Sequence, residues 1–457
     1  MNRPDRVTFH KRLEEMLAEL KADIVSGALG PGDLLPPELE LTKRFRLSRN
    51  SIRHALEVLR QDGYIEKVPN VGSRVLEMEK PILVNVKFGV YRSVLRDMAL
   101  ETLIEAYNKT KPHVHIQLVL LPSEDYCDTV QSYMDHDMLD LLTVNNKHFL
   151  LFQERGMLGD LFQPLEPNPD AYPFLTQMFM EEERLFVQPL TFSPVVLCYN
   201  KKHFAEAGLA EPDSSWKWDQ LVRAAKRLSQ DKARFGFYYF VLSENRWSVF
   251  LLQNGVRMER NEDGALKLDQ PDLIRGLEFA RELLYSQTDA PVFLLDSEND
   301  AELLFKEEKA SMIMTTYYNL NLLHDCDFPF DIAPLPYAGQ FKTLLLNIGA
   351  AVNKRSKVKD EALAFLQYLS GETGQRLLGR HAYSLPSSKT AAEAESDRHT
   401  QHVSRFKLFR EIIPSFETYE ALNMRPSEFD LFRRELKLYW AKLESLEQFR
   451  QRIQPLL

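Results

Sequence analysis

Residues 36–60 read PPELELTKRFRLSRNSIRHALEVLR, and this stretch decides the fold of the N-terminal part of the chain. Pro36 and Pro37 end any preceding helix and preset the first turn of a helix over residues 38–45. Ser48 has the side chain of a good N-cap, so a second helix is expected to begin directly after it. The two helices are joined by a connector of only a few residues.

The second expected helix, residues 49–60, has one apolar face. Apolar residues recur at positions i, i+4 and i+7, which is the period of a buried helix stripe: Ile52, Leu56 and Leu59. Arg49, Asn50 and Arg53 then point outward at the N-terminal end. Arg can bond bidentately to guanine and Asn to adenine in the major groove, so this helix is predicted to recognise DNA. Such charges on an isolated helix are usually only solvated, but the supporting helix favours the DNA interpretation.

A β-hairpin is expected after the helix break at Asp62 and Gly63. Residues 64–68 and 73–76 have the pattern of two short strands around a turn. A hairpin in this position is a wing, whose side chains can contact phosphates or a minor groove. The candidate DNA-binding residues are therefore Lys43, Arg46, Ser48, Arg49, Asn50, Ser51, Arg53, Lys67, Asn70, Gly72 and Arg74. Lys43, Arg44 and Arg46 can equally serve only to keep the surface soluble.

Two motifs in this region resemble the winged helix-turn-helix of GntR-type bacterial transcription regulators. They are GALGPGDLLPPELEL at residues 27–41 and SRNSIRHAL at residues 48–56. Leu39 stands where many members carry a DNA-contacting Arg, Pro37 replaces the usual Ser, and Asn70 replaces the first Gly of the wing. Asn tolerates a positive φ, so the wing turn can survive, whereas Leu39 puts one DNA contact in doubt. The resemblance also implies a homodimer on a near-palindromic site.

Length and charge set the remaining domain organisation. At 457 residues, and at about 100–200 residues per domain, the chain is expected to fold into three units. The 44% of hydrophobic residues is sufficient for large cores. The first 80 residues carry a slight excess of Lys and Arg, whereas the rest is acidic and brings the net charge to −9. This asymmetry agrees with DNA contact at the N-terminal end only.

The cysteines and the N-terminus indicate the compartment. Cys127, Cys198 and Cys326 are isolated and lack CxxC spacing, so neither a disulfide framework nor a zinc site is expected, and the thiols should be reduced and buried. The N-terminus leads directly into an amphipathic helix over residues 9–26, without the apolar segment of a signal peptide. No run approaches the roughly 18 apolar residues of a membrane span. A cytoplasmic protein without a membrane partner is therefore expected.

After a short joint at residues 79–82, the sequence pattern changes to strands that alternate with helices. A strand at residues 82–90, a helix at residues 94–110 and a strand at residues 114–121 predict a parallel sheet with a right-handed crossover. The alternation continues through five further segments, at residues 139–144, 149–156, 186–189, 195–199 and 218–228.

Five short motifs from this region resemble the bacterial extracellular solute-binding proteins of sugar importers, the group that includes maltose-binding protein. They are YNKKHFAEAGL (199–209), KWDQL (217–221), LQNG (252–255), FKEEKASM (305–312) and DEALAFLQYL (360–369). The resemblance covers residues 82–457 and implies a periplasmic-binding-protein-like α/β domain of two lobes with a ligand between them.

The whole chain is thus expected to be multidomain. A winged helix-turn-helix of the α+β class at residues 1–78 precedes a two-lobed α/β effector domain at residues 83–457. Lobe one would cover about 83–190 and 342–380, and lobe two about 191–341 and 381–457.

A carbohydrate site needs aromatic platforms beside amides and charged hydrogen-bonding groups. Loops that follow the expected strands supply these side chains, and the candidate effector-binding residues are Tyr91, Arg92, Asn145, Asn146, Phe192, Trp247, Tyr317, Tyr318 and Asn347. For each aromatic residue, packing in a core remains the alternative. Trp218 is assigned to packing.

Metal binding and glycoside hydrolysis are only weakly indicated by the sequence. His113 and His115 share a strand face and Asp135–Asp137 is acidic, but no third metal ligand is apparent. Asp296 and Glu298 could form the carboxylate pair of a glycosidase, yet no phosphate loop, nucleophile elbow or dinucleotide fingerprint occurs. Neither an enzyme nor a cofactor is therefore expected.

These patterns together predict a one-component transcription regulator, a repressor that binds operator DNA as a dimer. A mono- or oligosaccharide between the lobes would control its operator affinity. Two alternatives stay open: a cytosolic carbohydrate-processing enzyme with a DNA-binding arm, and a ligand-independent DNA-binding protein.

Overall fold

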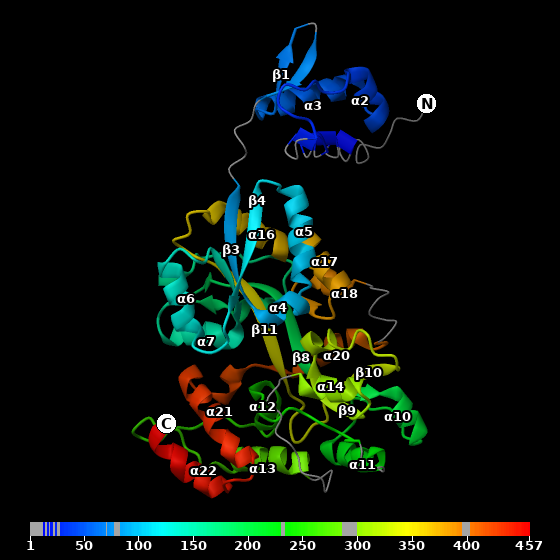
Figure 1. Cartoon of the computed structure of the whole chain (residues 1–457). Helices are drawn as coiled ribbons and strands as arrows, with labels where there is room; N and C mark the ends of the chain where they lie inside the picture. The colour runs from blue at the N-terminus through cyan, green and yellow to red at the C-terminus, as the bar shows by residue number, and fades with distance from the viewer. Residues whose placement is uncertain are drawn as a thin grey trace. The chain divides into compact units, whose positions relative to one another are not determined.

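The structure is a computed structural model, shown in Figure 1. It describes residues 12–13, 16–17, 19–21, 23–24, 28–69, 71–76, 83–229, 234–285, 299–394 and 403–457. The chain forms two compact units. One contains residues 1–86 and 104–117, and the other contains residues 87–103 and 118–457.

The N-terminal unit contains the predicted helix pair and hairpin. Its elements are α2 (Glu38–Phe45), α3 (Arg49–Gln61), β1 (Ile65–Val68) and β2 (Gly72–Val75). Arg46 ends α2 in the left-handed conformation, with a φ of 51°, and thereby turns the chain into α3. The Ser48 hydroxyl accepts the backbone N–H of Ser51 at 3.2 Å, which confirms Ser48 as the N-cap of α3.

A small apolar core holds these elements together. Ile52, Ala55 and Leu59 of α3 are fully buried, whereas Leu56, predicted for the same stripe, is only partly buried. Ile65 and Val75 lie opposite each other in the antiparallel hairpin and close the core from the wing side. The predicted turn residue Asn70 lies outside the described residues.

Most of the larger unit is built on one mixed sheet, of which the first residues of β3 and of β4 are counted with the other unit. Its main strand order is β10-β8-β11-β5-β3-β4, with β9 and β12 paired to β8 and β13 paired to β11. The strands are β3 (Val84–Tyr91), β4 (Val114–Leu121), β5 (Leu141–Asn145), β8 (Gln188–Asn200), β9 (Met312–Thr316), β10 (Phe330–Ala333), β11 (Thr343–Val352), β12 (Leu385–Pro386) and β13 (Phe416–Glu417).

Only part of this sheet is parallel. Phe88 of β3 pairs with Leu141 of β5 in parallel, as the strand–helix–strand pattern predicts. The pairs of β8 with β9, β10 and β11, and of β11 with β5, are antiparallel. The parallel prediction was therefore wrong for this part of the sheet, because β8 and β11 pass between the lobes in opposite directions.

Strand β8 joins the two lobes. We predicted two short strands at residues 186–189 and 195–199, but the structure has one strand of 13 residues that is buried at every position. Its first half pairs with β11 and its second half with β9 and β10. Burial on both faces explains why apolar residues predominate along β8, and the polar side chains among them, such as Thr191 and Ser193, are also buried.

Helices cover this sheet on both sides of the lobe crossing (Figure 1). Before β8 come α4 (Arg92–Asp97), α5 (Leu100–Thr110), α6 (Tyr126–Asp135), α7 (Asn146–Glu154), α8 (Leu158–Leu161) and α9 (Pro173–Gln177). After it come α10 (Lys201–Glu206), α11 (Trp218–Leu228), α12 (Glu244–Gln253), α13 (Pro271–Tyr285), α14 (Asp300–Lys306), α15 (Tyr317–Leu320), α16 (Lys359–Ser370), α17 (Glu372–His381), α18 (Lys389–Glu393), α20 (Phe409–Ile412), α21 (Pro426–Trp440) and α22 (Leu446–Ile453). The helix predicted over residues 94–110 is divided at Ala99, whose φ is 47°.

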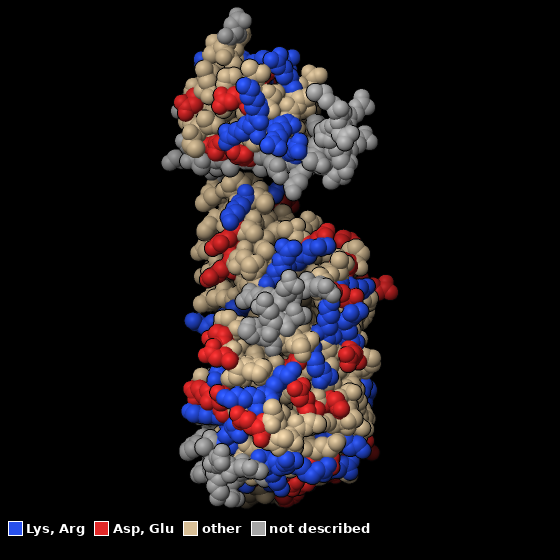
Figure 2. Space-filling view, turned by 90° about the vertical axis from the view of Figure 1, so that its right-hand side faces the viewer, with Lys and Arg blue, Asp and Glu red and all other residues tan. Residues whose placement is uncertain are grey.

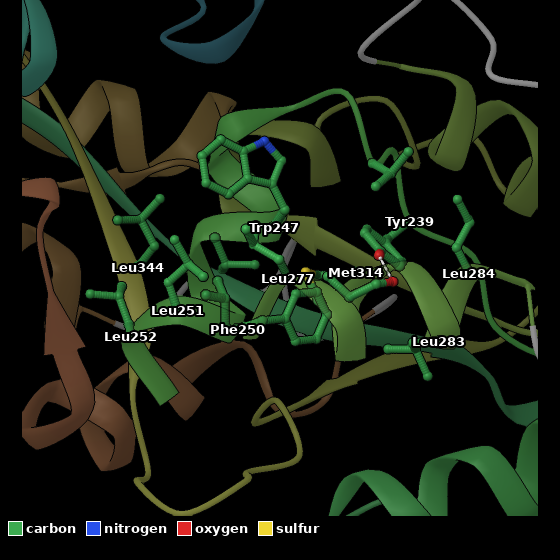
Figure 3. Packing of buried hydrophobic residues seen from close by; sticks show 14 of the residues in the cluster. Tyr239, Trp247, Phe250, Leu251, Leu252, Leu277, Leu283, Leu284, Met314 and Leu344 are labelled. Atoms are coloured by element: carbon green, nitrogen blue, oxygen red, sulfur yellow. Dashed lines mark hydrogen bonds between the residues drawn. The ribbon is translucent and has the colours of Figure 1, made fainter. Parts of the chain in front are cut away.

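An aromatic-rich core fills lobe two. Trp218 is buried and its indole N–H donates to Gln253 Oε1 at 2.7 Å, which confirms its predicted packing role. In the same cluster Trp247, Phe250 and Leu344 of β11 lie close together (Figure 3). This packing brings α12 against the strand that continues into lobe one.

The structure also bears on the expectations for the cysteines, for metal ligands and for membrane segments. Cys127, Cys198 and Cys326 are free and buried, as predicted. Among the described residues, no group of three or more His, Cys, Asp or Glu side chains is placed to hold a metal ion. Asp296 and Glu298 lie outside the described residues. No described helix has the length and apolar character needed to traverse a bilayer.

A buried carboxyl in α4 gives a prediction for stability. Burial raises the pKa of Asp97 to about 7, although Arg96, 2.7 Å away, opposes the shift. Because this folded-state pKa lies above the unfolded value, the contribution of Asp97 is fully present below about pH 4 and is lost as the pH rises through 7. The free energy of unfolding, measured in urea, should therefore fall from pH 4.5 to pH 7.5 in the wild type relative to Asp97→Asn.

The control for this prediction is Asp137→Asn. The hydrogen bond from Lys357 lowers the pKa of this exposed carboxyl, so any pH effect has the opposite sign. A wild-type-minus-Asp97→Asn difference that stays constant with pH would contradict the assignment.

Candidate nucleic-acid interface and lobe interface

The exposed N-terminal end of α3 carries the predicted base-contacting side chains. Ser48, Arg49 and Asn50 are exposed, and the hydroxyls of Ser48 and Ser51 lie 2.7 Å apart. Arg49 makes no ion pair with another described residue. Figure 2 shows Lys and Arg side chains grouped on one face of this unit, with fewer Asp and Glu side chains beside them. An exposed cationic helix end of this kind suits contact with a polyanion.

Arg53 is placed differently from Arg49. Its Nε donates to both carboxylate oxygens of Glu38, at 3.2 and 2.9 Å, so the ion pair links α3 to α2. The Arg53 side chain is still 62% exposed. If Arg53 contacts DNA, its guanidinium is shared between the DNA and Glu38. Arg49 has no ion pair with a described residue, so its guanidinium is the more available of the two.

The wing and the connector supply the remaining candidates. Arg74 lies opposite Glu66 in the hairpin, with Nη1 3.6 Å from the carboxylate. Lys67 and Gly72 are exposed at the wing, and Lys43 and Arg46 are exposed on and after α2. Leu39, the departure from the family pattern, is 53% exposed. With the exception of Asn70, the predicted residues thus lie at the surface of this unit or partly exposed in it.

In the larger unit, four charged side chains meet between the lobes. Lys147 Nζ lies 3.1 Å from Glu244 Oε1 and 2.7 Å from Asp430 Oδ1. Arg433 Nε lies 3.8 Å from Glu244 and 3.7 Å from Asp430. Lys147 belongs to α7, Glu244 to α12, and the other two to α21. We call these four residues the ion cluster; its formal charges cancel.

The ion cluster is mostly shielded from water. Burial by itself would raise the pKa of Glu244, but Lys147 and Arg433 outweigh burial and hold that pKa below its usual value. Conversely, burial would lower the pKa of Lys147, whereas Glu244 and Asp430 keep it raised. Both groups are therefore charged around neutral pH, and each compensates the other.

A second contact joins the same two helices. The Glu154 carboxylate, at the C-terminal end of α7, accepts the Ser427 backbone N–H at 3.1 Å and the Ser427 hydroxyl at 2.7 Å. Ser427 lies in the first turn of α21, where a carboxylate is also favoured by the helix dipole. Helices α7 and α21 are in contact, and they face each other across the two lobes in Figure 1.

A buried aromatic group holds the start of α7. The Tyr91 hydroxyl lies 2.7 Å from Nδ1 of His148, and the Tyr126 ring stacks on the imidazole at 4.2 Å between centroids. Burial lowers the pKa of His148 to about 3, so the imidazole is neutral. Asn145 caps the helix by accepting the His148 backbone N–H at 2.8 Å. Tyr91 and Asn145, both predicted as effector-binding, therefore position the helix that carries Lys147.

Three other predicted effector residues have an unsatisfied polar atom. Asn146 Oδ1, Asn347 Oδ1 and Trp247 Nε1 are buried and have no hydrogen-bond partner among the described atoms. The amide nitrogens of Asn146 and Asn347 donate to the carbonyls of Met178 and Leu175, at 3.5 and 3.2 Å. Buried polar atoms without partners are rare in folded proteins and call for an explanation such as a bound molecule.

The remaining candidates lie in other surroundings. Phe192 is fully buried opposite Asn347, and Trp247 stacks on Phe429 at 5.5 Å between centroids. The hydroxyls of Tyr317 and Tyr318 donate to the carbonyls of Phe406 and Thr191, at 2.8 and 3.0 Å. Arg92 is exposed at the start of α4. The structure thus brings Asn146 and Asn347 together at Met178 but places four of the predicted aromatics in cores.

Sequence reasoning missed the ion cluster itself. Lys147 directly follows Asn146, but nothing local shows that it reaches Glu244 and Asp430, which lie far along the chain. The available signal was the pair Asp430 and Arg433, three residues apart on a helix with large buried aromatics. Opposite charges on a mostly apolar helix face indicate a paired, partly buried contact.

Comparison with known proteins gives two family matches. Residues 95–376 match the family described as bacterial extracellular solute-binding protein. Residues 13–75 match the family described as bacterial regulatory proteins, gntR family.

Individual relatives cover different parts of the chain. The HTH-type transcriptional regulator TreR of Bacillus subtilis is 30% identical over 136 residues, which are 29% of this chain and 54% of TreR. The chain thus spans about half the length of that regulator. The multiple sugar-binding protein of Streptococcus mutans is 21% identical over 301 residues, 60% of this chain and 68% of that protein. The maltose-bound MalE3 protein of T. maritima has a TM-score of 0.70 at 17% identity, covering 82% of this chain and 100% of that one.

The ion cluster predicts a large effect of one substitution on stability. Lys147→Met leaves two carboxylates with Arg433 as their one cation in the cluster, and breaking a buried ion pair in this way costs about 3 kcal/mol or more. The free energy of unfolding in urea should fall by this amount. Lys357→Met is the matched control, because its exposed pair with Asp137 is expected to contribute less than about 1 kcal/mol. Equal losses in the two variants would show that the cluster is not effectively buried.

Proposed function

Because the chain belongs to the bacterial extracellular solute-binding protein family and carries a gntR-family regulatory domain at its N-terminus, we propose that it is a ligand-controlled transcription regulator. The DNA-binding domain would comprise residues 1–78 and the effector domain residues 83–457. Within the latter, we assign lobe one to about 83–190 and 342–380, and lobe two to about 191–341 and 381–457. Since operator DNA is its target, the proposed place of action is the cytoplasm.

The observation that carries the DNA-binding proposal is the exposed N-terminal end of α3. Arg49 and Asn50 are exposed there and combine the two side-chain types that can distinguish guanine and adenine in a major groove. Ser48 caps this helix end, so its backbone is ordered before DNA arrives. We assign the exposed residues Lys43, Arg46 and Lys67 to phosphate contacts, which contribute affinity but no sequence information.

We further propose a homodimer on a near-palindromic operator. One recognition helix covers only a few base pairs, and two symmetric copies would bind half-sites about one helical turn apart. Repression follows most simply if the occupied operator excludes polymerase from a promoter.

For the effector we propose a neutral mono- or oligosaccharide held at the lobe interface. Asn146 and Asn347, which both contact Met178, offer two acceptors without partners among the described atoms, and sugar hydroxyls can donate to both. The ion cluster, whose Lys147 directly follows Asn146 in the chain, has no net charge, so a neutral ligand leaves its compensation intact. The names of the sugar-binding relatives support the same class of ligand.

The effector must distinguish two states of the protein in order to regulate it. A ligand shifts operator affinity only by its differential affinity for the two lobe arrangements, and couplings of this kind are typically about 1–3 kcal/mol. Contacts across the lobes at α7 and α21 are the part of the described structure that such a ligand would strengthen or break.

Two alternative functions give different results in the same assays. A carbohydrate-processing enzyme would convert an oligosaccharide during incubation, which chromatography detects as new products. A ligand-independent DNA-binding protein would bind its operator unchanged in the presence of every sugar.

For DNA recognition, we expect Arg49→Ala to weaken binding to an operator selected from a random oligonucleotide library by about 1–3 kcal/mol and to relax base preference at one position of each half-site. The control is Arg60→Ala on the same helix, because Arg60 is paired with Glu57 at 2.6 Å near the other end. Fluorescence anisotropy at fixed salt measures both. Equal affinity of Arg49→Ala and wild type would refute α3 as the recognition helix.

For the effector, a panel of neutral mono- and oligosaccharides should contain one that raises the Tm of the full chain. At a concentration 100 times its Kd, such a ligand stabilises the folded state by about 2.7 kcal/mol. Asn146→Ala should weaken this ligand about tenfold by removing one buried acceptor. The exposed Asn261→Ala serves as control and should leave the Tm shift unchanged. If no saccharide in the panel shifts the Tm, the carbohydrate assignment fails, whatever the outcome for DNA.

A further inference from the structure

A cavity of about 410 Å³ lies in lobe one, apart from the lobe interface. Three segments form it: the loop at residues 163–168, the first residue of β8, and the second half of α16 with Gly371. None of its lining residues belongs to the ion cluster, and neither Asn146 nor Asn347 is among them. Along β8, Gln188 is four residues from Phe192, which is about 13 Å in an extended strand. Phe192 pairs with Asn347 of β11.

One residue that lines the cavity has a buried donor without a partner among the described atoms. Gln188 is 4% exposed, and its Nε2 has no hydrogen-bond partner among the described atoms. Its neighbours are already engaged, since Asn168 Nδ2 donates to the Ser370 carbonyl at 2.6 Å and Gln163 Nε2 to the Pro164 carbonyl at 3.4 Å. The Asn168–Ser370 bond also fastens the loop to α16, so the cavity has fixed walls.

The lining restricts the charge of any occupant. Its apolar part consists of the side chains of Pro164, Leu165, Leu363 and Leu366. Among the described residues that line it, none is a Lys or Arg, and the one carboxylate, Glu166, is exposed. An anion would find no cation and would be repelled by Glu166, whereas a cation would lose its hydration for one exposed partner. Only a neutral molecule fits without an electrostatic cost.

We propose that this cavity is a second ligand site, which takes a small neutral molecule with an apolar body and a carbonyl or hydroxyl oxygen that accepts from Gln188 Nε2. Its volume lies within the range of roughly 300–1,000 Å³ typical of small-molecule sites. A carbonyl group of the ligand satisfies the one unpaired donor, and the leucine side chains cover the rest of the molecule. The site is independent of the saccharide proposed for the lobe interface.

The test uses two probes of similar size with the full-length chain. ε-Caprolactam is neutral and has a carbonyl acceptor on an apolar ring, whereas cyclohexanecarboxylate is an anion. Saturation-transfer NMR titrations should show saturable binding of the lactam and none of the carboxylate. Equal binding of the two probes, or no binding of the lactam at millimolar concentration, would overturn the proposal.

Three variants locate the binding. Leu363→Trp fills the cavity and should abolish the lactam signal, while the same change at the exposed Leu303 of α14 should leave it intact. Gln188→Leu keeps the cavity but removes the donor and should weaken the lactam about tenfold. Gln188→Leu keeps the proposal testable if Leu363→Trp fails to fold. Unchanged lactam affinity in Gln188→Leu would show that the donor does not bind the probe.

Discussion

The continuity of strands β8 and β11 through both lobes is the constraint on which the larger unit depends. Each strand leaves the sheet of one lobe and enters that of the other, so the lobes share backbone hydrogen bonds rather than a flexible linker. A strand buried at all 13 positions must satisfy every backbone group by pairing, and β8 does so with different partners in its two halves.

Charged and polar side chains contribute to the contact from α7 to α21 across the interface. The ion cluster carries two positive and two negative groups at low exposure, and their mutual attraction offsets the cost of removing them from water. Such a contact is specific in geometry but gains little net free energy.

In the N-terminal unit, too, an ion pair joins two helices. Its apolar core consists of few residues, and it leaves the N-terminal end of α3 free of apolar contacts. The Glu38–Arg53 pair crosses from α2 to α3 and orders this end without covering Arg49. The sequence motif pointed equally to Arg49 and Arg53, and only the structure distinguishes an exposed arginine from a paired one.

Much of the fold was predictable because local signals determine it. The caps and helix period specified α2 and α3, the turn residues specified the hairpin, and the bounds of β4 and α11 agreed with their predicted ranges. The parallel prediction failed for β8 and β11, since pairing direction depends on where a strand goes after it leaves one lobe. The helix predicted over residues 94–110 failed at Ala99 because no glycine or proline marks its positive φ.

The sequence by itself determined the two kinds of domain, the capped recognition helix and the residue types available for a polar site. Periodicity, caps and motifs involve residues that are close together in the chain, so the amino-acid sequence is enough to show them. The tertiary structure alone decided that Lys147 meets Glu244 and Asp430, that Trp247 stacks within a core, and that Gln188 lines a cavity. Each of these depends on segments that are distant in the chain and come together only when the apolar faces of lobe helices pack on a shared sheet.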